Sequence, residues 1–302
     1  MRAWSREMDR DSSEQTIGRM VGYPVGPVAS APSPIVLADG KLLVDRPADG
    51  VARLTISNPT KRNALDRQLL DAMNVVLEEL SRLDSKTRCV IVTGANGTFS
   101  AGYEIGAIDE PGFHEEAERL VAHPFTSAID ALEAFPYPTL AAFPGHAIGG
   151  GLELSLACDM RVAIDAAKLG MPPAKLGLVY SHTGLRRFID TIGAARTREL
   201  FLLGNYIDAH TALGWGLVNR VCATAELESM TLGLASELAQ NAPLSQVGNK
   251  RVIAALLAER GALAEDLEHE LIELRAASFT SRDLREGMSA FADKRAPRWR
   301  GE

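Results

Sequence analysis

Cysteine is scarce in this sequence, which has three cysteines among 302 residues. Cys89, Cys158 and Cys222 lie in apolar stretches, are odd in number and show no spacing typical of metal ligands. These features argue against a disulfide-stabilised extracellular fold and against a structural zinc site. We expect three buried, free thiols in a reducing compartment.

Long apolar runs and long basic runs are missing as well. No stretch reaches the length of a membrane span. The first 20 residues mix acids and bases without an apolar core, which argues against a secretory signal or a transit peptide. With a net charge of −7 and no long basic run, the chain is a poor candidate for nucleic-acid binding. We expect a cytoplasmic protein with neither a membrane nor a nucleic-acid partner.

What the sequence does contain is an alternation of strand-like and helix-like segments. Hydrophobic residues make up 46% of the chain, enough for the core of one large α/β domain. Helical spacing of apolar residues predicts helices, and short β-rich runs predict strands. The predicted helices are 66–83, 115–135 and 195–204, and the predicted strands are 51–57, 87–94, 139–145, 160–164 and 217–221. Such alternation predicts parallel strands joined by helical crossovers.

The chain divides into three segments by composition. Residues 1–38 contain Gly, Pro, Ser and charges without periodicity, which is typical of a flexible arm. Residues 39–235 form the predicted α/β core. Residues 236–302 are helical by pattern throughout, and we expect this segment to serve in docking or oligomerisation.

The stretch GHAIGGGLELSLACD, from Gly145 to Asp159, places three glycines between a strand and an apolar helix. The first N–H groups of that helix have no intrahelical acceptor, and they attract negative charge. Glu153 follows in the first turn. The turn is either an anion-binding site, for a phosphate or a developing oxyanion, or a tight connection in which Glu153 complements the helix dipole.

A second glycine-marked turn follows the strand at 87–94. In FSAGYEIGAI, from Phe99 to Ile108, small residues allow a sharp bend, and Tyr103 supplies an N–H just after it. Two such turns can direct one N–H each at a single oxygen, which is how an oxyanion hole is built. The sequence spacing does not prove that the two turns meet.

Five segments resemble the crotonase (enoyl-CoA hydratase/isomerase) superfamily in order and approximate spacing. They are NPTKRNALD, FSAGYEIG, GHAIGGGLELSLACD, LGMPPAKLGL and REGMSAFADKRAP, and together they cover about residues 40–300. The resemblance implies a spiral of ββα units with C-terminal helices that form a trimer or a dimer of trimers. It also implies an acyl-CoA thioester substrate, no cofactor beyond the coenzyme A carried by that substrate, and an oxyanion hole made by the N–H groups of Tyr103 and Gly150.

The same resemblance implies a catalytic carboxyl group at Glu153 and a set of positions that contact the substrate. In the family the C-terminal basic stretch lies near the nucleotide end of coenzyme A, so Lys294 or Arg295 could pair with a phosphate. The substrate-binding positions implied are Ala64, Ala101, Gly102, Ile105, His182 and Lys294.

One departure from the family pattern bears on the reaction. Hydratases of the superfamily use a second glutamate about twenty residues after the first, and here that position is Pro173. Hydration needs both a base and an acid. The methylmalonyl-CoA decarboxylase branch resembles this chain in having proline there and a tyrosine in a Leu-Gly-x-x-Tyr segment, here Tyr180 of LGLVY. We expect decarboxylation of a malonyl-type or methylmalonyl-type thioester, with Tyr180 orienting the substrate carboxylate.

Other interpretations stay open at this stage. The proton that completes decarboxylation could come from Tyr180, His182 or water. A hydratase or isomerase could use Glu153 together with an acid recruited from elsewhere, such as Glu104, Asp109, Glu115 or Glu116. The chain could also be an acyl-CoA-binding protein without catalytic activity.

Overall fold

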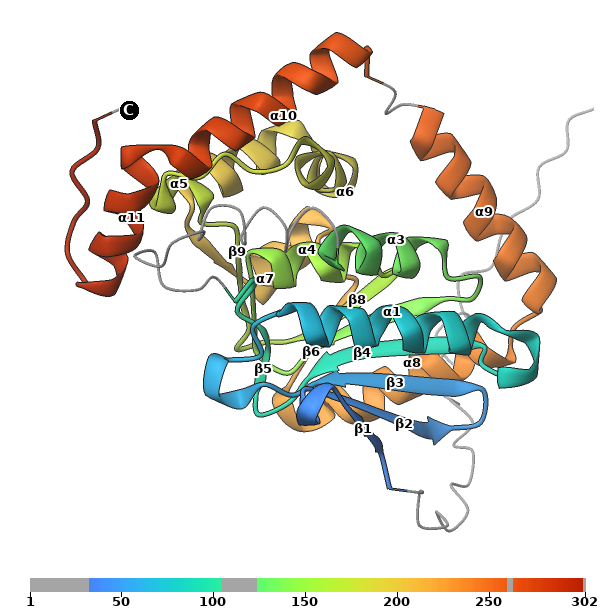
Figure 1. Cartoon of the computed structure of the whole chain (residues 1–302). Helices are drawn as coiled ribbons and strands as arrows, with labels where there is room; N and C mark the ends of the chain where they lie inside the picture. The colour runs from blue at the N-terminus through green and yellow to red at the C-terminus, as the bar shows by residue number, and fades with distance from the viewer. Residues whose placement is uncertain (1–32, 105–123, 260–262, 301–302) are drawn as a thin grey trace, which may run out of the picture. The chain divides into compact units, whose positions relative to one another are not determined.

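A seven-stranded sheet is the largest element of the computed structural model, which describes residues 33–104, 124–259 and 263–300 (Figure 1). The strand order is β1-β2-β3-β4-β6-β8-β11. Strands β1 to β3 are antiparallel, and each later neighbour is parallel to the strand before it. The strands are β1 (Ile35–Leu37), β2 (Leu42–Ala48), β3 (Val51–Ile56), β4 (Cys89–Gly94), β6 (Thr139–Phe143), β8 (Met160–Ile164) and β11 (Arg220–Cys222).

Both faces of this sheet are buried, which explains its nearly continuous apolar strands. One face packs in a cluster with helix α1 (Arg67–Ser81) and contributes residues such as Leu54, Val92 and Phe143. The other face, which includes Val51 and Leu140, packs against helix α8 (Leu227–Gln240). Figure 1 shows α1 and α8 on opposite sides of the sheet.

A second sheet of short strands lies beside the first, with the order β10-β9-β7-β5. Its strands are β5 (Thr98–Ser100), β7 (His146–Ile148), β9 (Lys168–Gly170) and β10 (Tyr206–Asp208). Strands β5, β7 and β9 each follow directly on a strand of the large sheet, namely β4, β6 and β8. A helical segment comes after each pair, so the chain repeats a ββα unit. The predicted α/β spiral is confirmed.

Helices connect the strands and form the C-terminal part of the chain. Those after the second sheet's strands are α3 (Thr126–Ala134), α4 (Gly150–Leu156), α5 (Pro173–Leu176), α6 (His182–Leu203) and α7 (Ala209–Trp215). The last three are α9 (Pro243–Glu259), α10 (Glu265–Thr280) and α11 (Arg282–Ala292). C-terminal helices are therefore present as expected, but the last one ends at Ala292, and residues 293–300 are not helical. Lys250 ties α9 to the core through an ion pair of 2.7 Å with Asp159.

Several segment boundaries differ from those expected. The sheet begins at Ile35, before the predicted start of the core at residue 39, while most of the proposed arm lies outside the described residues. Helix α6 starts at His182 rather than near residue 195, and it bends at Gly193, whose φ is +77°. The first part of the helix predicted over 115–135 lies outside the described residues, and α3 accounts for the rest.

The three cysteines are buried and free, as expected. In the described part of the chain, no helix is both long and apolar enough to cross a bilayer. No group of acids, histidines or cysteines in the same part could hold a metal ion.

Candidate active site

The two glycine-marked turns meet at one end of the second sheet. Strands β5 and β7 are parallel neighbours, so the turns that follow them leave the sheet on the same side. A Cβ on Gly102, whose φ is +98°, would lie 3.0 Å from the carbonyl oxygen of Ile148 and 3.2 Å from the amide nitrogen of Gly150. Only glycine allows this backbone conformation and so close an approach without strain.

Each turn offers one backbone N–H at this junction. Gly150 is the first residue of α4, so its N–H has no acceptor within the helix. Tyr103 forms a parallel bridge with Leu65, and the flanking bonds run from Leu65 N to Gly102 O and from Glu104 N to Leu65 O. Among the described residues, neither the Tyr103 nor the Gly150 N–H has a backbone acceptor. The arrangement is compatible with the predicted oxyanion hole.

Glu153 lies in the first turn of α4 with its side chain in the interior, 2% of the residue being exposed. The Tyr180 hydroxyl donates to its Oε2, and the Tyr103 hydroxyl donates to the same atom at 3.4 Å. The two phenol oxygens lie 3.5 Å apart. On the other side, Nη1 of Arg187 donates to Oε1 at 3.4 Å. Both oxygens of the carboxyl group are therefore engaged.

Burial sets the protonation of this cluster. It raises the pKa of Glu153 above its ordinary value, while the Tyr180 hydrogen bond and the charges of Arg187 and Arg275 act in the opposite direction. Burial also raises the pKa of Tyr103 and Tyr180 well above that of a free phenol, with the nearby Glu153 charge adding to the effect. Both phenols are protonated hydrogen-bond donors near neutral pH.

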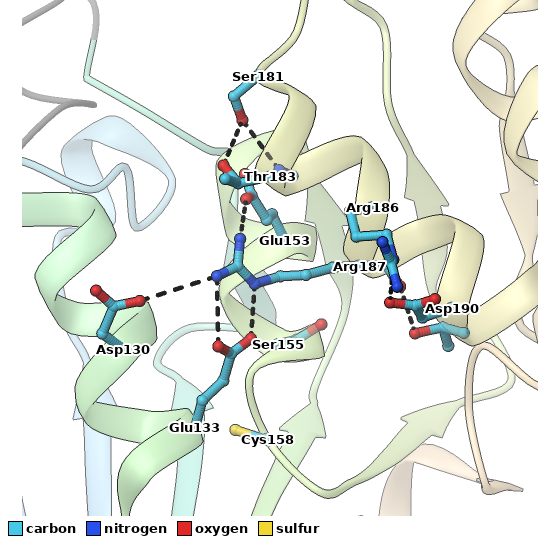
Figure 2. A network of polar contacts seen from close by, with 12 residues as sticks. Asp130, Glu133, Glu153, Ser155, Cys158, Ser181, Thr183, Arg186, Arg187 and Asp190 are labelled. Atoms are coloured by element: carbon cyan, nitrogen blue, oxygen red, sulfur yellow. Dashed lines mark hydrogen bonds and ion pairs between the residues drawn. The ribbon is translucent and has the colours of Figure 1, made fainter. Parts of the chain in front are cut away.

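Arg187 connects Glu153 to the outer helix α3, as Figure 2 shows. Its Nε lies 2.6 Å from Oε1 of Glu133, and Nη2 lies 4.0 Å from Asp130. The guanidinium thus pairs with three acids contributed by α3 and α4. Its single positive charge already has three acidic partners before any ligand binds.

A cavity of about 290 Å³ opens next to Glu153. Its wall comes from α3, α4, the start of α6 and the middle of α10. The lining residues are Phe125, Thr126, Ile129, Glu153, Ser181, His182, Thr183, Arg187, Ile272, Arg275 and Ala276. The surface combines apolar side chains with two guanidinium groups, those of Arg187 and Arg275.

Most of the residues singled out by the sequence fall in or near this region. Tyr103, Gly150, Glu153 and Tyr180 lie together, next to Gly102. We keep their catalytic roles as a proposal.

The other substrate-binding candidates are more scattered. His182 lines the cavity, and its Nε2 lies 3.5 Å from Oε1 of Glu268. Ala64 is buried, whereas Ala101 is exposed and its N–H donates to the backbone carbonyl oxygen of Arg62. Lys294 is exposed just past the end of α11, and its side chain forms no hydrogen bond or ion pair with a described residue. Ile105 lies outside the described residues.

The sequence interpretation missed Arg187 and Arg275. Arg187 is 34 residues from Glu153 and 54 from Glu133, so no local sequence pattern indicates its contacts with these two acids. Pro173 is buried at the start of α5, and its ring offers no group for proton transfer.

Known proteins support the family assignment. The model of the Enoyl-CoA hydratase/isomerase family matches residues 46–302. YngF of Bacillus subtilis (strain 168), whose name gives it as an enoyl-CoA hydratase/isomerase, is 34% identical over 255 residues, covering 83% of this chain and 95% of YngF.

Solved structures agree with this result. A methylmalonyl-CoA decarboxylase in complex with 2-nitronate-propionyl-CoA has a TM-score of 0.78 and 27% identity, covering 87% of this chain and 99% of that one. An enoyl-CoA hydratase/isomerase from Pseudoalteromonas atlantica T6c has a TM-score of 0.73 and 30% identity, covering 86% of this chain and 100% of that one. The chain therefore belongs to the enoyl-CoA hydratase/isomerase family, the crotonase superfamily of acyl-CoA-processing enzymes.

Proposed function

We propose that this protein decarboxylates a malonyl-type or methylmalonyl-type CoA thioester. The observation that carries the proposal is the lack of a second buried acid: Glu153 is the only acidic side chain among the buried residues of the described chain. Pro173 stands where a hydratase of the family has its second glutamate. Hydration requires a base for water and an acid for carbon, whereas loss of carbon dioxide requires an electron sink.

The thioester supplies that sink. When the bond between the α-carbon and the carboxylate breaks, its electron pair moves into the thioester carbonyl and forms an enolate, and carbon dioxide leaves. The N–H groups of Tyr103 and Gly150 stabilise the enolate oxygen. Each such donor is worth about 3–4 kcal/mol in comparable sites. A proton then adds to the α-carbon, and the product is an acyl-CoA shorter by the lost carboxylate.

The contact between Tyr180 and Glu153 changes the role assigned to the tyrosine. A phenol has a single proton to donate, and that of Tyr180 goes to Glu153. Tyr180 is therefore occupied as a donor, and orienting the substrate carboxylate falls to another group. We assign Glu153 and Tyr180 together to delivery of the proton to the enolate, because a buried carboxyl group with a raised pKa is a suitable acid.

Similarity supports this proposal in part. One structural neighbour, at TM-score 0.78, is a methylmalonyl-CoA decarboxylase. Relatives such as YngF are instead named for enoyl-CoA hydration and isomerisation, which favours a second candidate function.

Hydration or isomerisation would need a second acid at a position other than that of Pro173. Glu104 is the described candidate, but its carboxyl group faces Lys61 at 3.5 Å and the Asn58 amide at 3.5 Å. Asp109, Glu115 and Glu116 lie outside the described residues.

We also propose that the protein acts in the cytoplasm as a homotrimer or a dimer of trimers. Helices α9 and α10 expose an unusual number of large apolar side chains, which isolated chains avoid. These are Leu244, Val252, Ile253, Leu256, Leu257, Leu267, Ile272 and Leu274. Sedimentation at micromolar concentration should give the mass of three or six chains, and a single-chain mass would contradict this part of the proposal.

A substrate panel tests the reaction. Wild-type protein is incubated separately with malonyl-CoA, methylmalonyl-CoA and crotonyl-CoA, and the thioesters are followed by mass spectrometry. We expect loss of carbon dioxide from one or both of the first two and little change in crotonyl-CoA. Hydration of crotonyl-CoA with the malonyl thioesters intact would establish the second function. Binding without turnover of any of them would establish a binding protein.

A further inference from the structure

We infer that Arg275 binds a carboxylate carried by the acyl group of the substrate, inside the cavity next to Glu153. The inference rests on the proposed function and deepens it, since it names the feature that the site selects. It also supplies a group that orients the substrate carboxylate, since Tyr180 donates its hydroxyl proton to Glu153.

The two guanidinium groups of the cavity differ in what surrounds them. Arg187 meets Glu133, Asp130 and Glu153. The guanidinium of Arg275, on α10, forms no ion pair or hydrogen bond with any described residue, and the residue's one side-chain contact of this kind is the Ser278 hydroxyl on its backbone carbonyl. Of the two cations, Arg275 is therefore the one whose guanidinium N–H groups are available to a ligand.

Arg275 is also positioned rather than freely mobile. Its side chain is half-buried, and its guanidinium carbon lies 5.3 Å from the centre of the Phe279 ring, one helical turn further along α10. Stacking on an aromatic ring holds a guanidinium in a defined orientation. A partly buried cation without an anion has lost hydration that no protein group replaces. A planar carboxylate is the ligand that fits the fork of its N–H donors.

The rest of the cavity suits the carbon atoms of a short acyl group. Phe125, Ile129, Ile272 and Ala276 supply apolar wall, and the volume of about 290 Å³ lies at the lower end of small-molecule sites. The other ionisable groups facing it have partners: His182 lies against Glu268, and Glu153 lies against Tyr180 and Arg187. Arg275 is the cation of this cavity whose guanidinium has no ion-pair partner among the described residues, although its charge also acts on Glu153.

Phosphate groups of coenzyme A are the other anions that an arginine could meet here. The two sources make different predictions. A carboxylate contact discriminates between anionic and neutral acyl groups, whereas a phosphate contact strengthens the binding of every CoA compound equally.

The test measures binding of two unreactive thioethers of coenzyme A by titration calorimetry. One carries a carboxypropyl group, and the other carries an isobutyl group, in which a methyl replaces the carboxylate. We expect wild-type protein to bind the carboxypropyl compound at least about tenfold more tightly. Arg275→Met should abolish this preference, and Arg275→Lys should retain part of it. Arg198→Met is the control, because it removes an exposed positive charge from α6 and should leave the preference unchanged.

The outcomes separate this inference from the proposed reaction. Equal affinity of wild-type protein for both thioethers overturns it, and so does a preference that survives in Arg275→Met. Equal weakening of both compounds by Arg275→Met assigns the arginine to a coenzyme A phosphate instead. Since neither ligand reacts, a clear preference in a protein that releases no carbon dioxide would refute decarboxylation while leaving the carboxylate site standing.

Discussion

The hydroxyl group of Tyr180 donates a hydrogen bond to Oε2 of Glu153, a residue 27 positions earlier in the chain. The acceptor is buried in the first turn of α4, and the donor lies just before α6. Tyr103 reaches the same oxygen, and Arg187 reaches the other one. A single carboxyl group is thus held by donors from three parts of the chain, and removing any of them should change both its acidity and its use as an acid.

Replacing Tyr180 by phenylalanine should slow turnover. The change removes the strongest contact of Glu153 and leaves the ring packed against Phe201. Losing one hydrogen bond to a buried carboxyl group costs about 1–3 kcal/mol, so we expect kcat to fall about ten- to hundredfold. Steady-state kinetics of carbon dioxide release measure the effect. Tyr206→Phe is the matched control, because Tyr206 is exposed and its hydroxyl bonds to no described residue. Equal rates for wild type and Tyr180→Phe would refute the role of this contact.

Replacing Glu153 by glutamine should flatten the pH dependence of stability. Burial raises the pKa of Glu153 above 4.5 in the folded state, so the folded protein binds this proton more tightly than the unfolded chain. Wild-type stability relative to Glu153→Gln should therefore fall as pH rises from 4.5 to the folded pKa, and stay level beyond it. Urea unfolding of both proteins across this range gives the difference. A wild-type advantage that grows with pH would show that the pKa is lowered instead.

An alanine at position 150 should disable the site without unfolding the protein. A Cβ there would lie 2.7 Å from the Tyr103 ring, so the ring and the neighbouring backbone must move. We expect a loss of about 10²–10³ in kcat, as for removal of an oxyanion-hole donor. Kinetics and circular dichroism are measured together. Gly233→Ala in α8 serves as the control, because its methyl group would meet nothing within 4 Å. Full activity of Gly150→Ala would contradict the placement of the oxyanion hole.

The long strands of the fold could be predicted from sequence because of where they lie. Strands β3, β4, β6 and β8 are buried on both faces, so each is a short continuous apolar run that stands out in the sequence. The strands of the second sheet have three residues each, too few to show any period. Their existence depends on pairing between neighbouring turns of the spiral.

The site divides in the same way. Gly102 and Gly150 could be identified because glycines at turns after strands stand out in the sequence: Gly102 has a φ of +98°, and a Cβ on Gly150 would meet the Tyr103 ring. Arg187 and Arg275 could not, because arginine is common on exposed helices and only the folded chain places these two beside a cavity. The sequence predicts both Tyr180 and Glu153 as site candidates, but the hydrogen bond between them emerged only from the structure.

Replacing Arg187 by methionine should destabilise the protein and make Glu153 a weaker acid. The change removes the cation shared by Glu153, Glu133 and Asp130. Since the Arg187 charge lowers the pKa of Glu153, its loss should raise that pKa further. Urea unfolding at neutral pH should show a loss of about 1–3 kcal/mol. Arg186→Met removes an exposed ion pair with Asp190, four residues away, and a 3.3 Å hydrogen bond to the Leu257 carbonyl, and it should cost less, about 0.3–0.5 kcal/mol for the ion pair. Equal losses for the two variants would contradict a special role for Arg187.

The most direct test of decarboxylation follows the atoms of the substrate in heavy water. Malonyl-CoA and methylmalonyl-CoA labelled with ¹³C in the free carboxylate are incubated with wild-type protein, and gas and thioester are analysed by mass spectrometry. The account predicts ¹³C-labelled carbon dioxide together with an acyl-CoA that carries one solvent deuteron at its α-carbon. Label that stays in the thioester, under conditions in which the same protein hydrates crotonyl-CoA, would contradict it.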